Sequence, residues 1–190
     1  MGASTSWLAV KGKHRARVLE ELTLRVGDSP SDAQDSGLQG CDFPNGWYVI
    51  AARDYGHPLT EGATLQPLST GCEVVAGGVE THVMCSTACG WKDGREIWWM
   101  DHDSEVGVLN LSTRGQLPAA FTNIYEGLLA KQDAEGGPDC GVDFIFSVPE
   151  ELTKELTGYH YDNSQPGGIW HSLVTAPPPK KSWFGSLFKK

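Results

Sequence analysis

Four side chains between positions 82 and 102 are of the types that bind zinc: His82, Cys85, Cys89 and His102. Their order argues against one shared metal ion. Successive side chains of an extended strand alternate between its two faces, so His82 points away from the face that carries Cys85 and Cys89. Structural zinc sites also hold their close pair of ligands in a turn at shorter spacing. We therefore expect no metal ion and no other cofactor, and we interpret these thiols as buried side chains.

A β-hairpin turn lies between the cysteines and the second histidine. The dipeptide Asp93-Gly94 fits a two-residue turn whose central residues both need a positive φ angle. With Lys92 and Arg95 flanking that turn, antiparallel pairing fixes which residues face one another across the two strands. The expected cross-strand pairs, all on one face, are Cys89 with Trp98, Thr87 with Met100, and Cys85 with His102.

This pairing raises an enzyme as one alternative. Cys85 would be the nucleophile, His102 its base, and Asp101 or Asp103 the carboxylate that orients the imidazole. A catalytic thiol needs an electropositive pocket or a helix N-terminus to form a thiolate, and neither is evident around Cys85. We therefore favour a protein without catalytic residues and keep this enzyme as the alternative.

The most distinctive stretch is acidic and aromatic and runs from position 98 to 105. Its alternating carboxylates resemble ligands of a hard cation, but no EF-hand glycine or ligand order follows. A second interpretation is a strand that ends in a polar turn, with both tryptophans in the core. A third is a recognition surface, because aromatic rings bordered by carboxylates suit a basic partner. The predicted binding residues in this stretch are Trp98, Trp99, Asp101, His102, Asp103 and Glu105.

The C-terminal tail is basic and aromatic. A helix there would gather its apolar side chains on one side, with lysines at both ends. Such a segment suits docking onto a protein, recognition of a partner, or contact with an anionic membrane, in that order of preference. An adaptor or scaffold targeted by this tail is thus a further alternative. The binding residues that we predict in the tail are Trp183, Phe184, Leu187 and Phe188.

Hydrophobic periodicity predicts the main elements. Apolar positions at helical spacing predict a helix from Arg15 to Val26, closed by Gly27, and a second one behind Pro118. A third helix should begin at Ser147, with acids in its first turn, and end at Gly158. The expected strands are 46–53, the run from 72 to 88, the second arm of the hairpin, 107–112 and 142–146.

Composition places the chain among globular proteins. Of 190 residues 39% are hydrophobic and 21% charged, and no apolar run approaches the ~20 residues of a membrane span. The net charge is −9; the last fifteen residues contain four lysines and no acid, so the preceding 175 carry −13. An acidic body disfavours nucleic acid and favours basic partners. Five scattered cysteines and the absence of a signal-like N-terminus predict reduced thiols and a cytoplasmic location.

These observations predict an α+β fold. We expect a mostly antiparallel central sheet of about five strands, with two or three helices packed on it, plus a C-terminal tail. One domain should span residues 1–175, followed by a proline-rich spacer and the basic-aromatic tail at 176–190. The common nucleotide-binding and hydrolase motifs, such as G-x-x-x-x-G-K-[ST] and G-x-S-x-G, are missing.

The chain resembles a family of uncharacterised bacterial proteins over most of residues 6 to 162. That resemblance implies a bacterial cytosolic protein and transfers no catalytic residue. The small, acidic, tryptophan-rich body is also similar in kind to immunity proteins that neutralise bacterial toxins. The stretches that carry the family resemblance are Ser6–Lys13, Gly46–Val49, Gly71–Val75, Glu80–Met84, Gly90–Arg95 and Val142–Gly158.

The predicted function follows from charge, missing motifs and resemblance together. We expect a non-catalytic binding protein of the bacterial cytosol, of the immunity type, that masks a basic partner such as a toxin domain. The prediction requires that the stretch from Trp98 to Glu105 faces outward.

Overall fold

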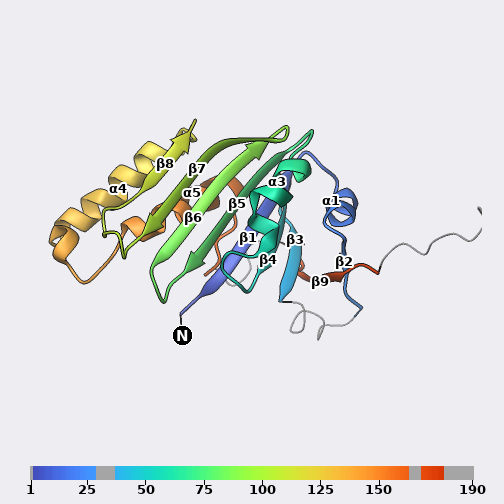
Figure 1. Cartoon of the computed structure of the whole chain (residues 1–190), viewed down its shortest axis with the longest axis horizontal. Coiled ribbons are helices and arrows are strands. Elements are labelled where there is room, and N and C mark those ends of the chain that lie inside the picture. The colour runs from blue at the N-terminus through green and yellow to red at the C-terminus, as the bar shows by residue number, and fades with distance from the viewer. Residues whose placement is uncertain (1, 29–36, 163–167, 178–190) are drawn as a thin grey trace, which may run out of the picture.

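One large antiparallel sheet organises the protein. The structure is a computed structural model and describes residues 2–28, 37–162 and 168–177. Within these residues nine strands lie in the order β2-β9-β3-β4-β1-β5-β6-β7-β8, all antiparallel (Figure 1). The strands are β1 (Ser4–Lys11), β2 (Leu24–Val26), β3 (Leu38–Asp42), β4 (Trp47–Ala52), β5 (Glu73–Glu80), β6 (Cys85–Lys92), β7 (Arg95–Asp103), β8 (Ser112–Gly115) and β9 (His171–Thr175).

The prediction of about five strands was therefore wrong, while the α+β class and the antiparallel pairing are as the sequence indicates. The sequence missed β1, β2, β3 and β9. Strands β1, β2 and β9 pair with partners far away in the chain, whereas β3 lies between the neighbouring strand β4 and the distant β9. Strand β2 has only three residues and pairs with β9, about 150 residues later. Pairing over such a distance leaves no local pattern to read.

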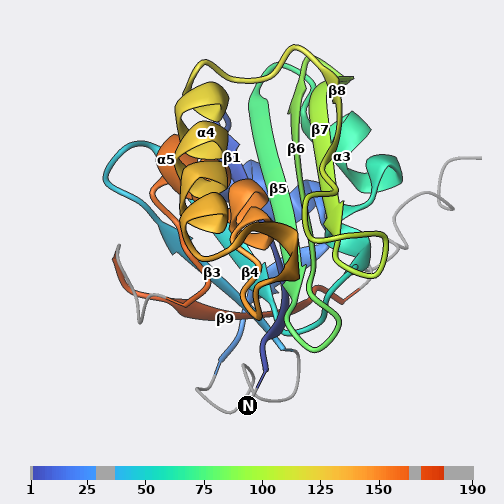
Figure 2. The ribbon, with the colours of Figure 1, turned by 90° about the vertical axis from the view of Figure 1, so that its left-hand side faces the viewer.

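Helices cover both faces of the sheet. The α-helices are α1 (Arg15–Glu21), α3 (Gly62–Leu68), α4 (Ala120–Ala134) and α5 (Val148–Thr157). Figure 2 shows α4 and α5 on one side of the sheet and α3 on the other. We call these sides the α5 face and the α3 face. Among the described residues, no helix is long and apolar enough to cross a membrane.

The central strand β1 carries core residues for both faces. Trp7 and Ala9 pack with Val75 on the α5 face, whereas Leu8 and Val10 pack on the α3 face. All of these side chains except that of Val75 are at most 1% exposed. The sequence of a strand that is buried on both faces is a continuous run of apolar residues, without alternation between apolar and polar residues.

Two of the three predicted helices are confirmed. Helix α4 follows Pro118, and α5 ends at Gly158, whose φ of 80° is the left-handed cap that glycine favours. Ser147 holds the N-cap position of α5, but its side chain makes no capping hydrogen bond there. The reason is that the short 3-10 helix η3 (Ile145–Ser147) runs directly into α5 with helical backbone angles.

The first helix is shorter than predicted. Helix α1 stops at Glu21, and Thr23 takes a left-handed φ of 54° that turns the chain into β2. The apolar residues assigned to one helix are thus divided. Val18 and Leu19 are buried by the helix, whereas Leu24 is buried by the strand.

Two predicted strands are wrong. Residues 107–112 form a connection, and β8 begins only at Ser112. Residues 142–146 lead into η3 because the Asp143 carboxylate accepts a hydrogen bond from the Phe146 amide at 3.0 Å, which closes a local turn.

Candidate functional site

The hairpin of β6 and β7 carries an extra residue. Asp93 and Gly94 form the predicted turn with φ angles of 49° and 76°. Trp91 then pairs with Glu96, but Gly90 pairs with Trp98, so Ile97 is bulged out of the ladder. The Trp98 indole lies over Gly90, where a Cβ atom would overlap it. The missing side chain of Gly90 makes room for this arrangement.

The bulge shifts every later pair by one residue. A one-residue shift turns each side chain to the other face of the sheet. The predicted hairpin register was therefore wrong beyond the turn, and Cys85 and His102 lie on opposite faces. The observed pairs are Cys89 with Trp99, Thr87 with Asp101, Ser86 with His102, and Cys85 with Asp103.

The thiols are poor nucleophiles as well. Burial raises the pKa of Cys85 to about 11, and the neighbouring carboxylate of Asp103 adds to the shift. Burial raises the pKa of Cys89 to about 12. Both side chains are thus protonated at neutral pH, and the Cys85–His102 enzyme has neither its geometry nor its thiolate.

His102 is a structural residue of the α5 face. It is fully buried, and its Nδ1 lies 2.6 Å from the Asn110 carbonyl oxygen while its Nε2 lies 2.9 Å from Asp143 Oδ2. Ser86 faces His102 across the strands, but its hydroxyl donates to the Phe146 carbonyl at 2.7 Å. Ser86, His102 and Asp143 thus lie close together, but both ring nitrogens of His102 already have partners, so neither is available to the Ser86 hydroxyl. They join β7 to the segment before α5.

Trp98 belongs to the same core. It is 5% exposed and packs under α5 and the start of α4. The predictions of Trp98 and His102 as outward binding residues of β7 were therefore wrong, because the bulge turns both toward the helices. The tail residues Trp183, Phe184, Leu187 and Phe188 lie outside the described residues.

The remaining residues of the stretch do face outward. Trp99, Asp101 and Asp103 alternate along β7 on the α3 face and are each partly exposed. We call the surface formed by these three residues, with Cys85 and Thr87 opposite them on β6, the acidic strip. Figure 1 shows α3 in front of β1 and β5, whereas β7, β8 and most of β6 have no described helix in front of them.

No ion pair within the described residues neutralises the negative charge on the acidic strip. Among the described residues, neither Asp101 nor Asp103 forms an ion pair with a lysine or arginine. Partial burial raises the pKa of Asp101, and repulsion from Asp103 raises it further. Burial raises the pKa of Tyr55 to about 12, and the negative charges of Asp101, Cys85 and Asp103 add to the shift. Tyr55 thus forms a wall of the strip that the sequence did not predict.

Asp103 also shapes the end of the strip. Its Oδ1 accepts a hydrogen bond from the Glu105 amide at 2.9 Å, which fixes the turn after β7. Glu105 is exposed in that turn. All three predicted carboxylates therefore lie at one end of the uncovered surface, and Glu105 lies at its margin.

A cation already lies on Trp99. The Arg114 guanidinium of β8 is 4.2 Å from the centroid of the Trp99 ring and makes two hydrogen bonds, of 2.7 and 3.1 Å, to the Glu96 carboxylate. Beside them a cleft of about 350 Å³ separates β7 and β8 from α3. Sequence reasoning missed Arg114, because β8, the strand that carries it, was predicted a few residues too early.

Within the described residues, no group of three or more histidine, cysteine or acidic side chains is placed to hold a metal ion. Comparison of the chain with protein-family models, curated proteins and solved structures finds no match.

Proposed function

We propose that this protein is a non-catalytic binding protein whose acidic strip takes the basic surface of a protein partner. The observation that carries the proposal is the pair of Asp101 and Asp103. Both carboxylates lie on a sheet surface without a helix over it, and neither has a basic partner within the described residues.

The physical argument is one of charge complementarity. Asp101 is partly desolvated and repelled by Asp103, so a lysine or arginine brought by a partner would relieve a cost that the free protein carries. Trp99 adds a flat ring that already accepts a guanidinium. The net charge of −9 would also speed the encounter with a cationic surface at low salt.

The partner that we propose is a toxin domain with a basic surface. A protein that blocks such a domain needs surface complementarity and no chemistry of its own. The raised pKa values of Cys85 and Cys89 and the occupied ring nitrogens of His102 favour this function over a thiol enzyme.

The experiment uses an alternating arginine-threonine decapeptide as the probe and its glutamate-threonine counterpart as the negative control. Asp101→Lys with Asp103→Lys should weaken binding of the arginine peptide at least about tenfold and reduce its dependence on salt. Glu126→Lys on the exposed surface of α4, combined with Glu135→Lys at its C-cap, changes the net charge equally and should leave affinity within about twofold.

Two results would overturn the proposal. One is equal weakening by both double variants, which would show attraction by net charge alone. The other is no measurable binding of the arginine peptide by the unmodified protein at low salt.

A further inference from the structure

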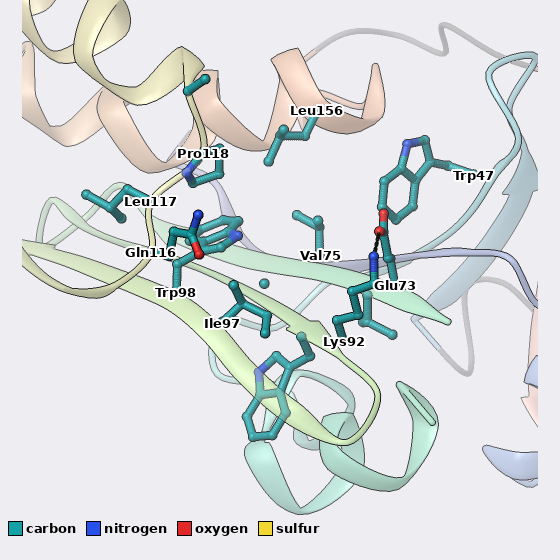
Figure 3. Close-up of a pocket in the computed structure, with 14 residues that line it drawn as sticks. Trp47, Glu73, Val75, Lys92, Ile97, Trp98, Gln116, Leu117, Pro118 and Leu156 are labelled. Atoms are coloured by element: carbon teal, nitrogen blue, oxygen red, sulfur yellow. Dashed lines mark hydrogen bonds and ion pairs between the residues drawn. The ribbon is translucent and has the colours of Figure 1, made fainter. Parts of the chain in front are cut away.

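A cavity of about 370 Å³ opens on the α5 face, away from the acidic strip (Figure 3). It lies near the Asp93-Gly94 end of the hairpin. Val75 lies at its floor, and the indoles of Trp47 and Trp98 stand at its sides. Gly90 also lines it. Leu156 of α5 and Pro118, which precedes α4, lie over it.

The fold explains why this space is open. Helix α5 ends at Thr157 and α4 begins at Ala120, so the cavity lies between the end of one helix and the start of the other. Gly90 contributes no side chain to the cavity, because the Trp98 indole needs the space above it. The bulge at Ile97 also leaves that side chain at the rim, 38% exposed, instead of in the core.

Two polar side-chain groups that line this cavity have no hydrogen-bond partner within the described residues. Within the described residues, neither the Trp98 Nε1–H group nor the Gln116 side-chain amide makes a hydrogen bond. Figure 3 shows the Trp98 nitrogen turned toward the middle of the cavity and the Gln116 amide beside the same ring. The charges at the mouth neutralise one another, since Lys92 Nζ lies 2.6 Å from Glu73 Oε1.

We infer that this cavity binds a neutral, planar, bicyclic heteroaromatic small molecule. Such a ring would pack against the two indoles and Val75 and accept a hydrogen bond from Trp98. Its other polar edge would pair with the Gln116 amide.

Size and charge support this class of ligand. Small-molecule sites are mostly apolar spaces of about 300–1,000 Å³ with a few polar groups that set orientation, and a molecule of about eleven heavy atoms fits the lower end. A charged ligand is disfavoured, because Lys92 and Glu73 at the mouth of the cavity already form an ion pair with each other. The inference concerns the opposite face from the acidic strip and does not depend on the proposed function.

The test uses quinazolin-4-one, whose carbonyl can accept from Trp98 and whose N–H can donate to Gln116. Protein labelled with 5-fluorotryptophan is titrated and followed by ¹⁹F NMR, with the Trp98 signal assigned from its loss in Trp98→Phe. Saturable movement of the Trp98 and Trp47 signals is expected, with a Kd on the order of 0.1–1 mM. Quinoline, which lacks the carbonyl and the N–H, should bind about five- to tenfold more weakly.

Variants locate the binding site. Trp98→Phe keeps an aromatic ring and removes the N–H group, and should weaken quinazolin-4-one about five- to tenfold. Gln116→Leu should do the same without touching the core, since Gln116 is exposed and its backbone amide still donates to the Ile97 carbonyl. The matched control is Trp99→Phe on the α3 face, which should leave the affinity unchanged.

The inference fails if no signal of Trp98 or Trp47 saturates up to about 5 mM probe. It also fails if Gln116→Leu, with an unchanged melting temperature, binds quinazolin-4-one as well as the unmodified protein does. Equal or tighter binding of a charged analogue, quinoline-4-carboxylate, would contradict the neutral class of ligand.

Discussion

At the scale of single residues, Asp101 has two opposed roles. Its carboxylate is partly buried beside Asp103, so its ionisation costs free energy in the folded protein, and the same charge is what a basic partner would recognise. A binding residue that costs stability is expected where a surface is kept ready for a ligand.

Asp101→Asn should therefore stabilise the free protein at neutral pH. The folded-state pKa of Asp101 lies above its ordinary value, so its contribution to stability is fully present in acid and is lost as pH rises through the folded pKa. Asparagine does not ionise, so the variant does not lose this stability as the pH rises. Because the side chain is partly exposed and its charge is screened by solvent, we expect a gain of only about 0.5 kcal/mol, or about 1–2 °C in melting temperature. Scanning calorimetry at pH 7 and pH 3 checks this; a gain of equal size at both values would contradict it.

Glu150 is a buried acid of a different kind. It lies in the first turn of α5 at 6% exposure, and its Oε2 has no hydrogen-bond partner within the described residues. The nearest ring nitrogen, His160 Nε2, is 3.8 Å away, and burial lowers the pKa of that imidazole. Burial raises the pKa of Glu150 to about 7. The protein thus carries a carboxylate that begins to ionise inside the fold near neutral pH.

Glu150→Gln should change the dependence of stability on pH. The raised pKa means that the stabilising contribution of Glu150 is complete below about pH 4.5 and is lost as pH rises through about 7. The glutamine variant does not lose this contribution. Its free energy of unfolding should therefore exceed that of the unmodified protein by up to about 3 kcal/mol at pH 8 and differ little from it at pH 4.5. Urea unfolding at both pH values measures the difference. Parallel pH profiles for the two proteins would contradict the assignment.

At the scale of elements, the bulge at Ile97 decides which residues form the site. The turn at Asp93-Gly94 was predictable because its chemistry is local. The bulge depends on the Trp98 ring lying over Gly90 and on the close approach of Gly115 to the Ile97 carbonyl, so it could not be read from the hairpin alone. Because of this one extra residue, Trp99, Asp101 and Asp103 share the face of Cys85 and Cys89, where the predicted register placed Trp98 and His102.

The difference between local patterns and contacts made only in the tertiary fold also explains which elements were predicted. Helices α4 and α5 have periodic apolar positions, and α5 has its glycine cap, so the sequence shows both. Strand β1 is buried on both faces, so it lacks the alternation that marks an exposed strand and was not predicted, while β9 and β2 are defined by each other. Tyr55 and Arg114, which complete the acidic strip, were missed because only the tertiary fold brings them to β7.

The His102–Asp143 pair should hold two of these elements together. His102→Leu leaves Asp143 buried without its partner, since that carboxylate is only 8% exposed, and should destabilise the protein by about 3–5 kcal/mol. Asp143→Leu should cost a similar amount, because the imidazole loses the acceptor of its Nε2.

A double-mutant cycle by urea unfolding measures the coupling. The variant with both substitutions should be destabilised by clearly less than the sum of the two single changes, since no charge is then left unpaired. Additive losses would show that the two side chains do not act as a pair.

At the scale of the whole molecule, helices cover the two faces of the sheet unequally. The α5 face is covered by the two longest helices and holds most of the aromatic core, including Trp7 and Trp98. On the α3 face, α3 lies in front of β1 and β5 (Figure 1) and packs against Trp91 near the end of β6, whereas no described helix lies in front of β7, β8 or the rest of β6. This unequal covering leaves one broad sheet surface without a described helix over it, and our proposal assigns the partner to that surface.

The most direct measurement of this account is a map of where a basic chain binds. The unmodified protein, labelled with ¹⁵N, is titrated with the arginine-threonine decapeptide and followed by two-dimensional NMR. We predict that the amide signals of Thr87, Trp99, Asp101 and Asp103 move most, and that the movement shrinks as salt is added. The largest movements on α4 and α5, with the strands of the acidic strip unchanged, would contradict the account.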